Sequence, residues 1–211
     1  MARQTLRRQP PRRRWTIATG LAVALAASCG GSGFRYVADR DAGVYFKLPD
    51  GWTTLPDEGV TEQFASPTAD ADTQRLIGFD AAPDPAVEHL LHPDAAHPAG
   101  LSRVRLLSIR ERDQLSLAAL RNEFLPVDSL PPGRVRLLAS EDIETDTGLH
   151  GTESTFEIGL DEGTYTLTQV VLVDAGTQVV YGLVVGCTQS CYAEQRSDIE
   201  AVVESWSIEE P

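Results

Sequence analysis

The stretch that decides the fold covers residues 151–185, GTESTFEIGLDEGTYTLTQVVLVDAGTQVVYGLVV. They are rich in threonine, valine and aromatic residues, which favour β-strands. Three-residue loops ending in glycine, at residues 161–163 and 174–176, separate these runs and suit antiparallel hairpins. Together with the run before Gly148, the pattern predicts an antiparallel meander with strands at residues 135–144, 151–158, 164–173 and 178–185.

Shorter patterns outside the meander predict further strands, the first two joined as a hairpin through Gly43. Residues 53–64 contain Pro56 and Gly59 and allow no assignment. The further strands are expected at residues 34–37, 44–48, 75–82 and 101–109.

Capping residues and prolines predict three helices. The first begins at Asp84, an N-cap residue before a proline, and ends at Pro93. The second begins at Ser116 and ends before Pro126. The third covers residues 192–205, and its core-facing stripe consists of Ile199, Val202, Val203 and Trp206.

Strands that are grouped together, with helices interspersed but not alternating with them, are typical of an α+β protein. We therefore predict a single α+β domain over residues 34–211, with an antiparallel β-sheet flanked by helices. A chain of this length is large enough to bury a core without a metal ion or a disulfide.

The N-terminus has the pattern of an export signal over residues 1–28. Six arginines and no acidic residue precede a short apolar run, Trp15 to Ala27, that ends in small residues. A membrane-spanning helix needs about 20 apolar residues, so we expect cleavage rather than an uncleaved anchor. We prefer the general secretory route to the twin-arginine route.

The segment Leu25-Ala26-Ala27-Ser28-Cys29 resembles a bacterial lipobox, in which the cysteine is acylated before cleavage. Ala26 stands where leucine is usual. We therefore predict Cys29 as the lipidated N-terminus of the mature protein, followed by a short tether over residues 29–33. Two acyl chains hold a protein stably at a membrane, whereas one chain is marginal.

The charge of the chain excludes one class of partner. Without the six leader arginines, 12 basic residues face 31 acidic ones, a formal net charge of −19. Such a surface repels phosphate backbones and anionic lipid headgroups. We expect no binding to nucleic acid, and contact with the membrane only through the lipid anchor.

The three cysteines leave an even pair once Cys29 is assigned to the lipid. Cys187 and Cys191 lie where a predicted strand turns into the last helix, in a compartment that permits oxidation. We predict a disulfide between them. The alternative is a pair of free thiols that bind metal or act as a redox switch, although three residues separate them instead of the usual two.

The sequence contains no recognisable catalytic or cofactor-binding motif, such as GxSxG, HExxH, a phosphate loop or a dinucleotide fingerprint. We predict no cofactor. His89 and His92 fall on the polar face of the first predicted helix, with His97 after a short loop, and together they are candidate zinc or copper ligands. The alternative is a solvated polar helix face.

Three features resemble the PsbP-like superfamily: the stretch VYFKLPDGW at residues 44–52, the strand ending at residues 180–183, and the terminal helix closing on residues 205–208. Within it, the chain looks most similar to LpqN-type lipoproteins of high-GC Gram-positive bacteria. The resemblance implies an antiparallel sheet between helical layers (α/β/α). It also implies action by binding proteins or small ligands rather than by catalysis.

Three functions follow as hypotheses. The first is a non-enzymatic, membrane-anchored lipoprotein that serves as a binding or assembly module of the cell envelope, with an envelope protein or small ligand as partner. The second is a cell-envelope hydrolase without a recognisable motif. The third is an envelope protein that binds metal through His89, His92 and His97.

Overall fold

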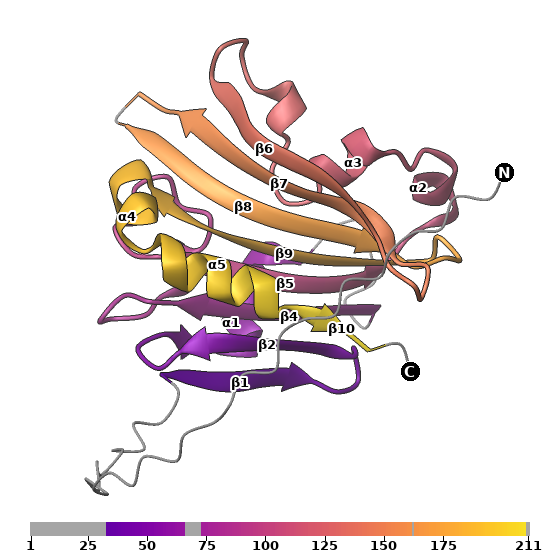
Figure 1. The fold of residues 1–211 in the computed structure, drawn as a ribbon, viewed down its shortest axis with the longest axis horizontal. Coiled ribbons are helices and arrows are strands. Elements are labelled where there is room, and N and C mark those ends of the chain that lie inside the picture. The colour runs from indigo at the N-terminus through magenta and orange to yellow at the C-terminus, as the bar shows by residue number, and fades with distance from the viewer. Residues whose placement is uncertain (1–32, 66–72, 162, 210–211) are drawn as a thin grey trace, which may run out of the picture. The chain divides into compact units, whose positions relative to one another are not determined.

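The computed structural model describes residues 33–65, 73–161 and 163–209 (Figure 1). The predicted signal peptide and Cys29 lie outside these residues. The strands are β1 Phe34–Asp39, β2 Val44–Pro49, β3 Thr53–Thr54, β4 Gln74–Asp80, β5 Ala99–Leu106, β6 Val135–Glu144, β7 His150–Gly159, β8 Thr164–Val173, β9 Val179–Thr188 and β10 Ser207–Ile208. The helices are α1 Asp57–Phe64, α2 Ile109–Asp113, α3 Leu117–Arg121, α4 Gln189–Glu194 and α5 Arg196–Ser205, with short 3-10 helices η2 Val87–His89 and η3 Val127–Ser129.

The central element is a seven-stranded antiparallel sheet in the order β3-β4-β5-β9-β8-β7-β6. The predicted meander β6–β7–β8–β9 is confirmed, and each strand pairs with the next in an antiparallel register. Strands β8 and β9 are buried along almost their whole length, because both faces of the sheet are covered. The edge strand β6 is exposed along most of its length and contains a bulge between Leu137 and Ala139.

Alternation along the strands assigns each side chain to one of two faces. Thr168 of β8 contacts Tyr192 of α4, whereas its neighbour Gln169 donates to the backbone oxygen of Arg121 in α3. We therefore name the two sides of the sheet the α5 face and the α3 face. Helices α4 and α5 cover the α5 face, and α2 and α3 pack on the opposite side (Figure 1). The expected α+β class, a sheet flanked by helices on both faces, is confirmed.

A second, three-stranded sheet with the order β1-β2-β10 packs beside α5 on the α5 face. Phe46 of this sheet contacts Phe79 of β4 at 5.6 Å between ring centroids, and Trp52 stacks on the same ring at 5.9 Å. Trp206, directly after α5, is buried and donates from its indole nitrogen to Ser102 at 3.3 Å. Both tryptophans therefore anchor the core, and for Trp206 this confirms the core-facing stripe predicted for the last helix.

Three sequence-based assignments are wrong in part. The expected helix over residues 84–92 is reduced to η2, because the buried Asp80 carboxylate accepts from the backbone of Ala86 and Leu91 takes a left-handed conformation. The expected strand 101–109 ends at Leu106, since Ser108 and Glu111 form a capping box that starts α2.

The single last helix is also divided. It begins earlier than expected, directly after β9, and breaks at Gln195 into α4 and α5. This break lets α4 stay beside the end of β9 while α5 lies along the sheet. The unassigned residues 53–64 form β3 and α1, and Gly59 allows α1 to approach Val87 closely. None of the helices within the described ranges is long and apolar enough to cross a membrane.

A buried ion-pair network holds α2 and α3 on the sheet. Arg105 of β5 donates twice to Glu123 at 2.8 Å and once to Glu111 at 2.9 Å. Arg103 donates to the backbone oxygen of Glu123 and to that of Phe64. The side chains of Arg103, Arg105 and Glu123 are 10% exposed or less, so these charges depend on one another for solvation.

We predict that Glu123→Ala lowers the free energy of unfolding by about 3–5 kcal/mol, because it leaves two buried guanidinium groups without their shared carboxylate. The matched control is Glu200→Ala, which breaks the exposed Arg196–Glu200 pair and should leave the free energy of unfolding almost unchanged, because solvent screens the two charges. Urea unfolding followed by circular dichroism measures both. Equal losses in the two variants would show that the network does not stabilise the fold.

Candidate functional site

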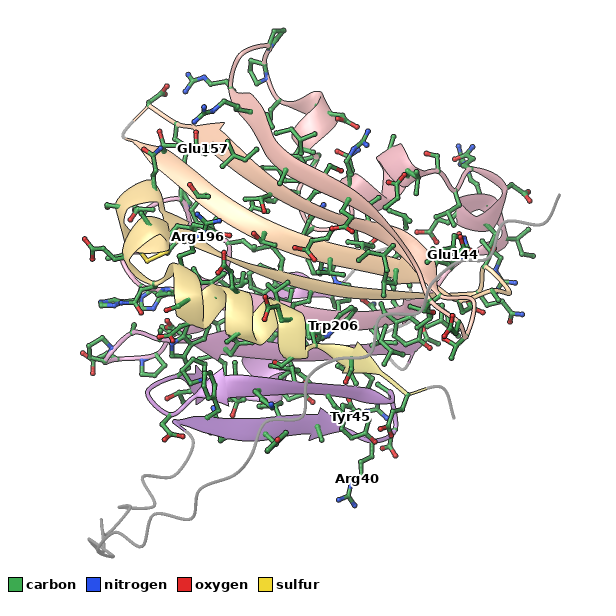
Figure 2. All side chains as sticks on the ribbon, viewed as in Figure 1. Arg40, Tyr45, Glu144, Glu157, Arg196 and Trp206 are labelled. Carbon is green, nitrogen blue, oxygen red and sulfur yellow. A yellow bond between two sulfur atoms is a disulfide. The ribbon has the colours of Figure 1, made fainter. Side chains whose placement is uncertain are left out.

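A groove of about 610 Å³ lies between the α5 face of the sheet and the helices α4 and α5. Its floor comes from β6, β7 and β8, and it exists because α4 and α5 leave this end of the sheet only partly covered. Figure 2 shows Glu157 on the sheet side of the groove and Arg196 on the helical side. The floor residues are Leu138, Ala139, Glu153, Thr155, Glu157, Thr166 and Thr168.

A chain of hydroxyl groups crosses the floor of the groove. Thr155 and Thr168, cross-strand neighbours on β7 and β8, lie 2.8 Å apart between their Oγ1 atoms. The Thr168 hydroxyl also contacts the Tyr192 hydroxyl at 2.5 Å. Burial raises the pKa of Tyr192, so this phenol stays protonated and keeps its hydrogen bond.

The next threonine along β8 lacks such a partner. Thr166 is 3% exposed and lines the groove, yet its Oγ1 has no hydrogen-bond partner within the described part of the chain. A buried hydroxyl without a partner costs roughly 1–3 kcal/mol. A ligand that supplied this hydrogen bond would recover that energy.

The two glutamates on the floor have opposite electrostatic surroundings. Glu157 accepts from the Arg136 guanidinium, with one bond at 2.9 Å, and from Gln189 at 2.9 Å. Its hydrogen bond with Arg136 lowers the pKa of Glu157. Glu153 lies opposite Glu141 across the β6–β7 ladder. Burial, and then the charges of Glu141 and Glu204, raise the pKa of Glu153.

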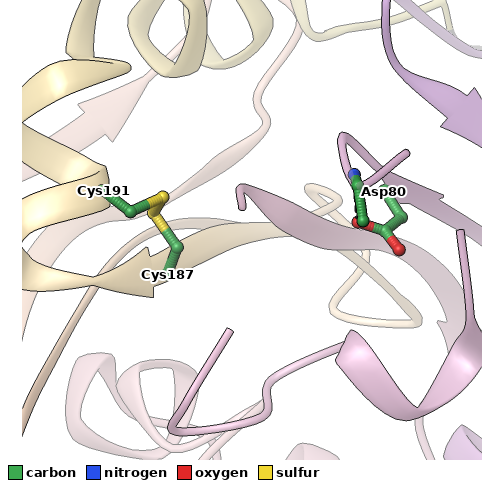
Figure 3. Close-up of a disulfide and its surroundings, with 4 residues drawn as sticks. Asp80, Cys187 and Cys191 are labelled. Carbon is green, nitrogen blue, oxygen red and sulfur yellow. Dashed lines mark hydrogen bonds between the residues drawn. A yellow bond between two sulfur atoms is a disulfide. The ribbon is translucent and has the colours of Figure 1, made fainter. Parts of the chain in front are cut away.

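The predicted disulfide is present and joins the end of β9 to α4. Cys187 and Cys191 are bonded, with their α-carbons 5.9 Å apart, and both are buried (Figure 3). Since α4 supplies Gln189 and Tyr192 to the groove, the disulfide fixes the helical wall against the sheet. A loop this short contributes only about 2 kcal/mol by the chain-entropy estimate, so its effect is local.

The three candidate histidines line a second, smaller pocket of about 310 Å³, together with Asp80 and Asp94. The carboxylate of Asp80, at the end of β4 (Figure 3), is fully buried and contacts His89 Nδ1 at 2.7 Å. His92 and His97 are exposed.

Asp80 also accepts from the backbone of Ala82 at 2.9 Å and of Ala86 at 3.0 Å. These bonds shape the loop that replaces the expected helix. His89 and His92 therefore do not lie on one face of a helix, which was the reason to expect that they bind a metal ion together. In the described residues, no group of three or more histidine, cysteine or acidic side chains is arranged to hold a metal ion. Metal binding by His89, His92 and His97 stays a hypothesis.

The sequence did not identify the groove. Glu153, Thr155 and Glu157 alternate along β7, which places them on one face, but the helix that covers this face could not be inferred. The polar Thr166 and Thr168 inside the hydrophobic strand β8 were the available signal. Buried polar residues in such a strand indicate a partner or a site on that face.

Comparison with solved structures identifies the fold. The solution structure of CyanoP, the PsbP protein of the cyanobacterium Synechocystis, aligns with 89% of this chain and 99% of its own, with 14% identity and a TM-score of 0.53. The chain has a PsbP-like fold. The PsbP-like resemblance of the sequence is therefore confirmed at the level of the fold.

Two other structures are similar at a lower score. LpqN, involved in cell envelope biogenesis of Mycobacterium tuberculosis, is 15% identical over 86% of this chain and 88% of its own, with a TM-score of 0.48. The Ran-binding protein Mog1p of Saccharomyces cerevisiae is 10% identical over 83% and 95%, with a TM-score of 0.42. No family model matches the chain, and no curated protein matches its sequence.

We predict that Glu153→Gln stabilises this PsbP-like domain at pH 7 by about 0.5 kcal/mol, a small gain because the side chain is only half buried and solvent screens its charge. Because the pKa of Glu153 is higher in the folded than in the unfolded state, stability falls as the pH rises through the folded-state pKa. Glutamine removes this loss.

The difference should disappear below about pH 4, where Glu153 is protonated in both states. Thermal unfolding at pH 4 and pH 7 measures it, with Glu144→Gln, an exposed acid at the end of β6, as the control. A stabilisation that is the same at both pH values would contradict the assigned cause.

Proposed function

We propose that this chain is a lipid-anchored, extracytoplasmic binding module of the bacterial cell envelope, of the LpqN type. Its binding site is the groove between the α5 face and the helices α4 and α5. The observation that carries the proposal is this groove of about 610 Å³, whose floor includes a buried hydroxyl that lacks a partner in the described structure.

The groove has the size and composition of a ligand site. Small-molecule sites are concave, about 300–1,000 Å³ in volume, mainly apolar and supplied with a few placed polar groups. Here Ile199 and Val203 of α5 provide apolar wall, while the floor presents hydroxyl and carboxyl groups. A small envelope ligand or one segment of a partner protein fits this description.

Anchoring through Cys29 is compatible with access to the groove. The domain begins with β1 at Phe34, five residues after Cys29. Strand β1 belongs to the small sheet, on the opposite side of the domain from β6 and β7 (Figure 1). A lipid attached ahead of β1 therefore leaves the groove accessible, and the net charge of −19 favours separation from anionic headgroups.

A cell-envelope hydrolase is the second candidate, favoured by the opposite pKa shifts of Glu153 and Glu157 in one groove. Two residues four apart along a strand are separated by about 13 Å at their α-carbons. Catalytic carboxyl pairs of glycosidases are about 5–9.5 Å apart. Glu157 is also engaged by Arg136 and Gln189. Both features favour binding over hydrolysis.

We predict that Cys29 is the acylated N-terminus of the mature protein, because it directly follows the apolar run and the small residues of the leader. Mass spectrometry of the protein extracted from membranes should give a lipid-modified peptide that starts at Cys29. Cys29→Ser should release the protein from the membrane fraction. An unmodified Cys29 within an intact N-terminus would refute the anchor.

We predict that a photo-reactive amino acid at Ala193 captures the ligand or partner in the native envelope, because Ala193 is exposed and lines the groove. The matched control is the same substitution at Ala118, an exposed alanine of α3 on the opposite face. Mass spectrometry of the irradiated protein should show an adduct at position 193 and none at position 118.

Two results would overturn this proposal. Equal labelling at both positions, or none at either, would remove the groove as the binding site. Turnover of an ester, glycoside or peptide substrate that is lost in Glu153→Gln would replace the binding module by a hydrolase.

A further inference from the structure

Charge is distributed unevenly along the groove. At one end, Glu157 is paired with Arg136, and Arg196 on the wall is paired with Glu200 at 2.7 Å. At the other end, Glu153 lies opposite Glu141 in the strand register, and Glu204 of α5 lines the same groove. The charges of Glu141 and Glu204 both act on Glu153.

These three carboxylates have no cationic partner among the residues that the structure describes. Like charges placed directly opposite each other on neighbouring strands destabilise a sheet. Across the rest of the groove each charged side chain is paired within the domain, so the repulsion at Glu153 stands out. A positive charge from outside the domain would relieve it.

The groove between its two ends is lined by apolar side chains of α4 and α5. Ala193, Ile199 and Val203 face it from the helices, and Leu138, which the β6 bulge displaces, borders it from the sheet. Apolar groups that lie along this wall would lose contact with water.

The far end of the groove offers a hydrogen bond. Thr166 is 3% exposed and lines the groove, and its hydroxyl lacks a partner in the described chain. Thr166 pairs with Glu157 in the register of β7 and β8, four residues along β7 from Glu153. At about 3.3 Å per residue, the acidic end and the free hydroxyl are about 13 Å apart along the strand.

We infer that the groove binds an amphiphilic organic cation. Its ammonium group lies between Glu153 and Glu204, its apolar chain lies along Ile199 and Val203, and a polar group at the other end reaches Thr166. The inference rests on the proposed function of the groove as a binding site and names the chemical class of its ligand. With carbon–carbon bonds of about 1.5 Å, roughly eight to ten of them span this distance.

An anion is disfavoured in this groove, because it would add negative charge to three close carboxylates. A metal ion is disfavoured too, because no group of three or more acidic, histidine or cysteine side chains in the described residues is arranged to hold one. An alkylammonium differs from both in needing one or two carboxylates and an apolar wall.

The test compares three amphiphiles of one chain length: octylammonium, octanol and octanoate. Isothermal titration at about 0.15 M salt, where exposed charges are screened beyond about 8 Å, uses the full-length chain with Cys29→Ser, which cannot be acylated. Octylammonium should bind about tenfold more tightly than octanol or better, and octanoate more weakly than octanol. The preference for octylammonium should grow as the pH rises and Glu153 ionises.

Three variants locate the charge and the wall. The pair Glu153→Gln/Glu204→Gln should reduce the affinity for octylammonium to that for octanol. Glu194→Gln removes the same charge from an exposed position of α4 outside the groove and should keep the preference. Ala193→Trp should fill the groove and abolish binding of all three, with circular dichroism confirming that the domain is folded.

The outcomes separate this inference from the proposed function. If octanol binds as tightly as octylammonium and Ala193→Trp abolishes both, the groove is a binding site but the cationic ligand is wrong. If no amphiphile binds while Ala193 is still captured in the envelope, the occupant is of another class and the inference fails alone. If Glu194→Gln weakens octylammonium as much as the double variant does, the binding is nonspecific attraction to an acidic surface.

Discussion

Strands β8 and β9 are buried on both faces, and the rest of the architecture follows from this constraint. A strand buried on both sides needs a covering layer on each, which α4 and α5 supply on one face and α2 and α3 on the other. Strand β8 is not purely apolar, since it carries Thr168 and Gln169 inside the protein. Tyr192 of α4 satisfies Thr168, and the backbone of Arg121 in α3 satisfies Gln169. These two hydrogen bonds attach α4 to one face of β8 and α3 to the other.

Much of the fold could be predicted because its strongest signals are local. The four meander strands are separated by loops whose composition specifies hairpins, and their observed bounds agree closely with the expected ones. The assignments that failed depend on distant residues. Residues 84–92 carry the capping signals of a helix, but Asp80, buried in β4, accepts the backbone N–H of Ala86 within this segment and that of Ala82 just before it. The end of β5 is an exception, because the capping box of Ser108 and Glu111 that ends it is a local pattern of the sequence.

The groove was less predictable than the fold, because its residues come from three strands and two helices whose packing is set by tertiary contacts. The disulfide could be predicted from the count and spacing of cysteines, whereas its role as a support for the groove wall could not. The cluster of acidic residues also depends on tertiary packing. Glu141 and Glu153 come from the adjacent strands β6 and β7, whereas Glu204, from α5, lies more than 50 residues later in the chain. Natural proteins concentrate conflicts of this kind at functional sites.

The pairing of β10 with β2 also has a consequence for folding kinetics. The Lys47 backbone donates to Ser205, which is 158 residues away, and β10 adds a third strand to the N-terminal hairpin. Contacts between such distant residues raise the contact order and slow folding. During synthesis from the N-terminus, the β1–β2 hairpin emerges first and has no partner at one edge until the last residues have been added. The small sheet is therefore the last part of the domain to close, and its open edge is the segment most exposed to misassociation or to a chaperone before folding is complete.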